Sequence, residues 1–205
     1  MKMPPLRLQH WLIFAVVALL FFAWGVWLMR AMAPAAPWPW FEELQSEVLE
    51  PLADDRLSLS QLHARLDGEL WLQPRPDGPR LLFRSAWPIA DGEPWSLEAE
   101  LALTPAERDS LANAFGVAGQ SGDEQPLGAQ MLERLGRHKV LSLRLRPGQD
   151  EAPAERLASS IGQPRLRLEL AEGQAWVYPE LGLTAHLRDE QLHLLHAVPR
   201  QALKQ

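Results

Sequence analysis

The longest apolar run of the chain lies near its N-terminus. Residues Trp11 to Met29 (WLIFAVVALLFFAWGVWLM) contain no charged side chain. At a rise of about 1.5 Å a residue, a helix of this length crosses the hydrocarbon core of a bilayer. Trp11, Trp24 and Trp27 lie near the two ends of the run, as in interfacial aromatic belts. The pattern predicts a transmembrane helix over residues 11–29.

The charges that flank this run predict its orientation. Lys2 and Arg7 precede it, whereas Arg30 alone follows it before a long uncharged stretch. Positively charged residues accumulate on the cytoplasmic side of membrane helices, so we expect residues 1–10 in the cytoplasm. A cleaved signal peptide is the alternative, because Ala31-Met32-Ala33 resembles a cleavage site. The long apolar run and the proline directly after that site favour a retained anchor.

A proline-rich segment, residues 30–40, separates the apolar run from the rest of the chain. Prolines end a helix and push the residues before them to extended backbone. The segment is therefore predicted to be an extended linker, unless Trp38 and Trp40 rest among the outer headgroups. In both cases we expect the domain of residues 41–205 to stay near the bilayer.

Helical periodicity recurs in short segments of this domain. Residues 41–54 place apolar side chains on one face and glutamates on the others, which predicts a juxtamembrane helix. Thr104-Pro105-Ala106-Glu107 combines a capping box with a proline at the first helical position, and Gly116 is a stop signal. A helix is therefore predicted to end near Phe115. Two further helices are predicted over residues 129–135 and 153–161.

The remaining segments have the two-residue alternation of half-buried strands. In residues 95–103, Leu97 and Ala99 face one way while Glu98 and Glu100 face the other. We predict strands over residues 70–72, 80–87, 95–103, 139–146, 164–170, 175–178, 183–188 and 192–198. The chain is thus predicted to be one N-terminal transmembrane helix followed by an α+β domain with an antiparallel, largely meander sheet and three to four short helices.

Composition narrows the functions open to this domain. The absence of cysteine excludes disulfides, thiolate metal sites and cysteine nucleophiles. The formal net charge of −6 argues against a nucleic-acid binder, which needs a positive field. The basic residues are mostly arginines, which together with a single anchor favours a bacterial inner-membrane protein with a periplasmic domain.

No motif in the sequence names a reaction. G-x-S-x-G, H-E-x-x-H and P-loop patterns do not occur. His186, His193 and His196 lie close in sequence, but residues three apart on a strand point to opposite faces of a sheet. We therefore expect no metal and no cofactor. A periplasmic hydrolase would be favoured only if one of these histidines met a serine or a carboxylate in a pocket.

Four arginines are candidate binding residues. Arg144, Arg146, Arg165 and Arg167 would form one basic stripe if the strands over residues 139–146 and 164–170 were neighbours. Guanidinium groups bind phosphate and carboxylate with two parallel hydrogen bonds. Such a stripe would fit an anionic lipid, a glycan or an acidic partner protein. The plainer alternative is the solvated face of a sheet.

Two tryptophans are the other binding candidates. Trp87 and Trp95 flank a turn, where at least one ring could be exposed as a contact anchor. Core packing is the alternative.

These patterns favour a non-catalytic, bitopic inner-membrane accessory or assembly subunit of an envelope complex, which contacts other envelope proteins through its periplasmic domain. A membrane-tethered binder of a lipid, glycan or other anionic envelope ligand is the first alternative. A periplasmic hydrolase is the second.

Overall fold

The computed structural model describes residues 8–31, 35–90, 92–117, 122–148 and 151–204. It divides into two compact units, residues 1–35 and residues 36–205. The first unit contains helix α1 (Leu8–Ala31), whose described side chains, Trp11 to Trp27, are nearly all exposed. Among the described residues, no helix combines the length and the apolar character needed to cross a membrane. Most of the predicted N-terminal tail, residues 1–7, lies outside the described residues.

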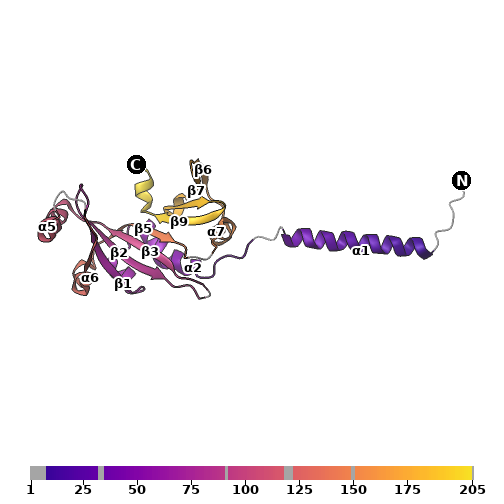
Figure 1. Ribbon diagram of the computed structural model, residues 1–205, viewed down its shortest axis with the longest axis horizontal. Helices are drawn as coiled ribbons and strands as arrows, with labels where there is room; N and C mark the ends of the chain where they lie inside the picture. The colour runs from indigo at the N-terminus through magenta and orange to yellow at the C-terminus, as the bar shows by residue number, and fades with distance from the viewer. Residues whose placement is uncertain (1–7, 32–34, 91, 118–121, 149–150, 205) are drawn as a thin grey trace. The chain divides into compact units, whose positions relative to one another are not determined.

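The second unit is built on one antiparallel sheet of nine strands (Figure 1). Its order is β4-β1-β2-β3-β5-β9-β8-β7-β6, so two meanders meet where β5 pairs with β9. The strands are β1 (Gly68–Gln73), β2 (Arg80–Trp87), β3 (Trp95–Leu101), β4 (Gln125–Leu127), β5 (Val140–Arg146), β6 (Leu166–Leu170), β7 (Gly173–Tyr178), β8 (Leu183–Arg188) and β9 (Gln191–Ala197). The predicted α+β fold with a large antiparallel sheet is confirmed.

Short helices accompany the sheet. They are α2 (Phe41–Leu44), a π-helical segment (Gln45–Leu49), α3 (Glu50–Ala53), α4 (Leu59–His63), α5 (Pro105–Phe115), α6 (Ala129–Leu135) and α7 (Ala154–Ile161), with 3-10 turns over Pro179–Leu181 and Arg200–Lys204. The helix expected over residues 41–54 is present, with a π-helical middle. The N–H of Glu50 donates to the carbonyl of Gln45, and Pro51 has no N–H to continue the α-helical pattern.

The core lies on one face of the sheet. The register places Phe83 opposite Ala99, Ala99 opposite Leu143 and Leu143 opposite Ala197, and all four are fully buried. Buried leucines and Phe41 from the helical segment of residues 41–53 belong to the same apolar cluster. The opposite face of β2, β3 and β5 carries charged side chains. The alternation in residues 95–103 therefore predicted correctly which side of β3 is buried.

Local signals predicted α5 well. The Thr104 side chain accepts from the N–H of Glu107, and the Glu107 carboxylate accepts from the N–H of Thr104. Gly116 ends the helix in the left-handed region, with φ of 66°.

Three predictions about the elements were wrong or incomplete. Helix α4 was not predicted, although Ser58 and Gln61 form a capping box before it. No strand was predicted between residues 116 and 128, where β4 lies, and residues 118–121 lie outside the described residues. Strand β6 was expected to be half-buried, but it lies at an edge of the sheet and the side chains on both of its faces are exposed.

Candidate functional site: a charge network on the polar face of the sheet

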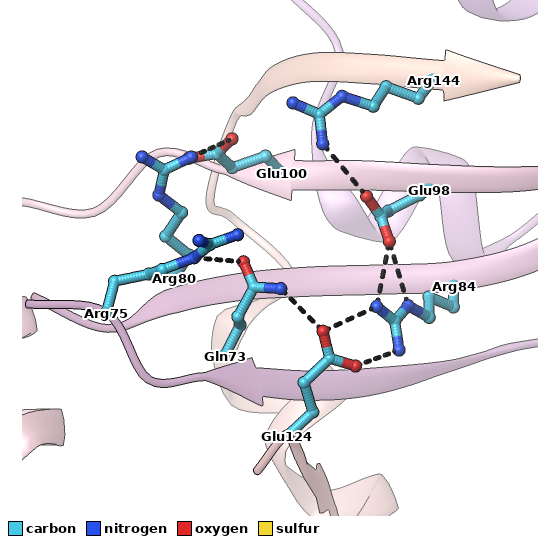
Figure 2. A network of polar contacts seen from close by, with 8 residues as sticks. All are labelled: Gln73, Arg75, Arg80, Arg84, Glu98, Glu100, Glu124 and Arg144. Atoms are coloured by element: carbon cyan, nitrogen blue, oxygen red, sulfur yellow. Dashed lines mark hydrogen bonds and ion pairs between the residues drawn. The ribbon is translucent and has the colours of Figure 1, made fainter. Parts of the chain in front are cut away.

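A row of charged side chains crosses the polar face of the sheet. Arg84 of β2 lies opposite Glu98 of β3, which lies opposite Arg144 of β5. Arg144 in turn lies opposite His196 of β9. Directly opposite residues in antiparallel strands point to the same face, so the row follows from register alone. Figure 2 shows the side chains of Arg84, Glu98 and Arg144 pointing toward one another.

Glu98 and Glu124 share the guanidinium group of Arg84. Arg84 Nε donates to Glu98 Oε2 at 3.1 Å, and its Nη1 and Nη2 donate to the two oxygens of Glu124 at 2.5 and 3.0 Å. The other oxygen of Glu98 accepts from Arg144 at 3.3 Å, and Gln73 donates to Glu124 at 2.6 Å (Figure 2). Two carboxylates thus connect four strands, β1, β2, β3 and β5, and the segment before β4.

The hydrogen bonds between Arg84 and Glu124 shift the pKa values of both groups. Hydrogen bonds from Arg84 are the main cause that lowers the pKa of Glu124, with a smaller contribution from Gln73. The same bond to Glu124 raises the pKa of Arg84. Arg84 also lies 5.5 Å from the ring centroid of Trp71, within the range of a cation–π contact. The network is therefore a set of paired charges, and the lowered pKa of Glu124 makes that carboxylate a poor candidate for a general base near neutral pH.

The predicted basic stripe does not form, because its premise fails. Strands β5 and β6 are separated by β9, β8 and β7. Arg144 lies on the polar face, whereas Arg167 lies opposite Trp176, whose ring is buried on the core side. The predicted arginines thus fall into two groups on different strands and different faces.

Each of these arginines has its own surroundings. Arg144 shares Glu98 with Arg84, and Arg165 forms an ion pair with Glu180 at 3.4 Å. Arg167 lies 4.4 Å from the ring centroid of Trp176 and donates to Gln163. Arg146 is exposed, and within the described part of the chain it forms no ion pair.

Neither of the predicted tryptophans is exposed. Trp87 and Trp95 lie opposite each other on β2 and β3 and are 3% and 4% exposed, so of the two alternatives the structure has core packing and not an exposed contact ring. Both rings belong to the main apolar cluster. Trp95 packs edge-on against Trp38 and Trp40, with ring centroids 5.3 and 4.7 Å apart.

Residues 36–40, which precede α2, are hydrogen-bonded to helix α7 of the same unit. Trp38 is buried, and its N–H donates to Ser160 Oγ of α7 at 2.9 Å. Arg156 of the same helix donates to the carbonyl of Ala36 and lies 5.5 Å from the ring centroid of Trp38. Trp38 and Trp40 therefore pack into the domain, and residues 36–40 are not a free linker.

The three C-terminal histidines do not converge. His186 and His196 are half-buried on the polar face, while His193 is exposed at a bulge between β8 and β9. Burial lowers the pKa of His196, with smaller contributions from Arg144 and His186. Within the described residues, no hydrogen bond joins these histidines to a serine or a carboxylate. No group of three or more His, Cys, Asp or Glu among those residues could hold a metal ion.

One pocket opens beside the charge network. It has a volume of about 220 Å³ and is lined by Arg80, Glu100, Arg108 and neighbouring residues. Ligand pockets usually span roughly 300 to 1,000 Å³ and are mostly apolar, so this hollow is small for an organic ligand.

The network cannot be seen in any one strand, because its residues come from four strands and the segment before β4. Opposite charges at matching positions of a predicted hairpin, such as Arg84 and Glu98, are a signal that could have revealed it. Glu124 gave no such signal, since it precedes a three-residue strand in a glycine-rich segment. Comparisons of the chain with protein-family models, with curated proteins and with solved structures found no match.

Proposed function

We propose that this chain is a single-pass protein of a bacterial inner membrane, with a cytoplasmic N-terminus and a periplasmic C-terminal domain. In this proposal the domain is a non-catalytic accessory or assembly subunit of an envelope complex, and it acts by contacting other proteins.

The observation that carries the proposal is the apolar surface of α1. From Trp11 to Trp24 every described side chain is exposed, and none is charged. A helix that is apolar all round requires an apolar environment. The sequence continues the uncharged run to Met29, and its eleven Leu, Ile, Val and Phe residues favour insertion by about 3 to 6 kcal/mol.

The attachment of residues 36–40 supports a role at the membrane surface. Because Ala36 and Trp38 are bonded to α7, only residues 32–35 separate the domain from the end of α1. An extended chain spans at most about 3.6 Å a residue, so these residues can separate the domain from the end of the proposed anchor by only a short distance.

Protein contacts are better supported than an anionic ligand. The arginines of the polar face are balanced by Glu98 and Glu124, so that face offers little uncompensated positive charge. In contrast, three leucines of β6 are among the few large apolar side chains of the domain that are exposed.

Topology is the first test. An alkaline phosphatase fused after residue 60 should be active, and the mature chain should retain its N-terminal residues. The L19R/L20R variant should leave the membrane fraction, because two arginines near the helix centre cost about 5 to 7 kcal/mol of insertion. The control is the Leu141→Arg variant, which places an arginine at an exposed position of the domain. This variant should remain in the membrane fraction. An inactive fusion, or an N-terminus at Pro34, would contradict the proposal.

The mode of action needs a second test. Full-length chain captured from detergent-solubilised membranes should retain the same envelope proteins after the R144Q/R146Q substitution, and raising the salt should not release them. Loss of the bound material in the folded R144Q/R146Q variant would favour the anionic-ligand alternative instead.

A further inference from the structure

Strand β6 leaves one edge of the sheet open. It pairs with β7 on one side, and no strand among the described residues pairs with its other side. Leu166, Leu168 and Leu170 are 50%, 43% and 47% exposed. An extended, regular edge strand with exposed apolar side chains is a template for another strand. The opposite edge is different, because β4 has three residues and contains Pro126, which has no N–H to donate.

Among the described residues, the two charged residues of β6 have no partner of opposite charge. Arg167 donates to Gln163, and Glu169 accepts from Gln174 at 3.0 Å. Within the described residues neither forms an ion pair, although most arginines on the other strands do. Both side chains lie on the face opposite the three leucines, since they alternate along the strand.

The sequence of β6 is complementary to itself when read in the opposite direction. If Leu168 is placed opposite Leu168 of a second antiparallel copy, Arg167 lies opposite Glu169 and Leu166 lies opposite Leu170. Every directly opposed pair is then apolar with apolar or positive with negative. We propose that β6 is an interface between two copies of this chain, paired antiparallel about a two-fold axis at Leu168.

The charges select this register over its neighbours. A shift by two residues places Arg167 opposite Arg167, or Glu169 opposite Glu169, of the second copy. Parallel pairing in register brings like charges together as well. Like charges directly opposite destabilise a strand pair, and a shift by one residue puts leucines and charges on the same face. Because the pairing is isologous, each favourable contact occurs twice.

The pairing uses only β6, so it stands independently of the proposed membrane function. It joins the sheets of two copies into one continuous sheet. It buries part of the surface of three leucines that are about half exposed in a single copy. It also gives Arg167 and Glu169 the ion pairs that they lack in one copy.

Cysteine cross-linking tests the axis directly, because the native chain contains no cysteine. Directly opposite residues have Cα atoms about 4.5 to 5.5 Å apart, which suits a disulfide. Full-length chain with L168C, purified in a mild non-ionic detergent and oxidised, should therefore form covalent dimers. The control is L141C, since Leu141 is 44% exposed but lies on the central strand β5. Equal dimer yields from L168C and L141C would overturn the proposal.

The register has its own cross-linking test. Differently tagged L166C and L170C chains should cross-link when mixed, because those positions face each other. L166C alone should not, since the two equivalent positions are about 13 Å apart along the strands. Self-cross-linking of L166C as efficient as that of L168C would contradict the proposed axis. A chain that cross-links to a different polypeptide instead would assign the edge to another partner.

Charge reversal provides a test that does not depend on cysteine. R167E or E169R alone should weaken dimerisation of the full-length chain about tenfold, measured by energy transfer between labelled copies. The double variant R167E/E169R should restore it, because each pair is then positive with negative again. The lost contact between Arg167 and Trp176 cannot be recovered by E169R, so rescue distinguishes pairing from a structural defect. Unchanged dimerisation in both single variants, or a double variant as weak as the single ones, would overturn the proposal.

Discussion

Strands β5 and β6 have similar sequences and opposite surroundings. Leucine alternates with polar or charged residues in both, as VLSLRLR in β5 and LRLEL in β6. In β5 the leucines Leu143 and Leu145 are fully buried and Arg144 is paired with Glu98. In β6 the leucines are exposed and the charges lack ion-pair partners among the described residues. The position of a strand in the sheet therefore decides whether this pattern builds a core or leaves a surface available for binding.

Leucine truncation should show the largest difference between the two strands. Leu143→Ala should lower the free energy of unfolding by about 2 to 5 kcal/mol, because it leaves a cavity at a fully buried site. Leu168→Ala should change it by at most about 0.5 kcal/mol in dilute solution. Denaturant unfolding of the full-length variants measures both values. Similar losses in the two variants would mean that β6 is not an exposed edge.

Neutralising a glutamate in the charge network and one in β6 should give a smaller difference in the free energy of unfolding. Glu98 is held by Arg84 and Arg144, so Glu98→Gln should lower the free energy of unfolding by about 1 kcal/mol. Glu169→Gln should leave it nearly unchanged at low protein concentration, because Glu169 accepts only from Gln174 among the described residues. Chemical denaturation gives both numbers. If Glu98→Gln costs no more than Glu169→Gln, the network contributes nothing measurable to stability.

Acidification should have the smallest effect on stability, and this effect should come from the centre of the sheet. His196 lies opposite Arg144, and burial lowers its pKa below the ordinary value of 6.5, with further contributions from Arg144 and His186. A lowered pKa means that the unfolded chain binds the proton more readily. The contribution of His196 is therefore present above pH 6.5 and is lost as the pH falls below it. His196→Gln should remove this part of the pH dependence in thermal melts, and an identical profile in the variant would contradict the assignment.

The sequence predicted those parts of the fold that depend on neighbouring residues. The Thr104–Glu107 capping box and Gly116 define α5 without help from the rest of the chain. The alternation of Leu97, Glu98 and Ala99 correctly predicted which face of β3 is buried.

Position within the sheet was beyond these local signals. The pattern of residues 164–170 is the same for a central strand and an edge strand, and only the pairing order separates β6 from β5. Strand β4 was not predicted, because Gln125-Pro126-Leu127 is short and contains a proline. The packing of Trp38 and Trp40 onto Trp95 likewise depends on contacts between residues far apart in the chain.

Hydrogen exchange at the two edges of the sheet tests the central claim most directly. The full-length native chain in detergent is compared at low and high protein concentration. If β6 pairs two copies, amides of residues 166–170 exchange more slowly at high concentration, while those of residues 125–127 at the opposite edge do not change. Exchange in β6 that is independent of concentration, or equal slowing at both edges, would contradict the assignment of β6 as the surface that pairs two copies.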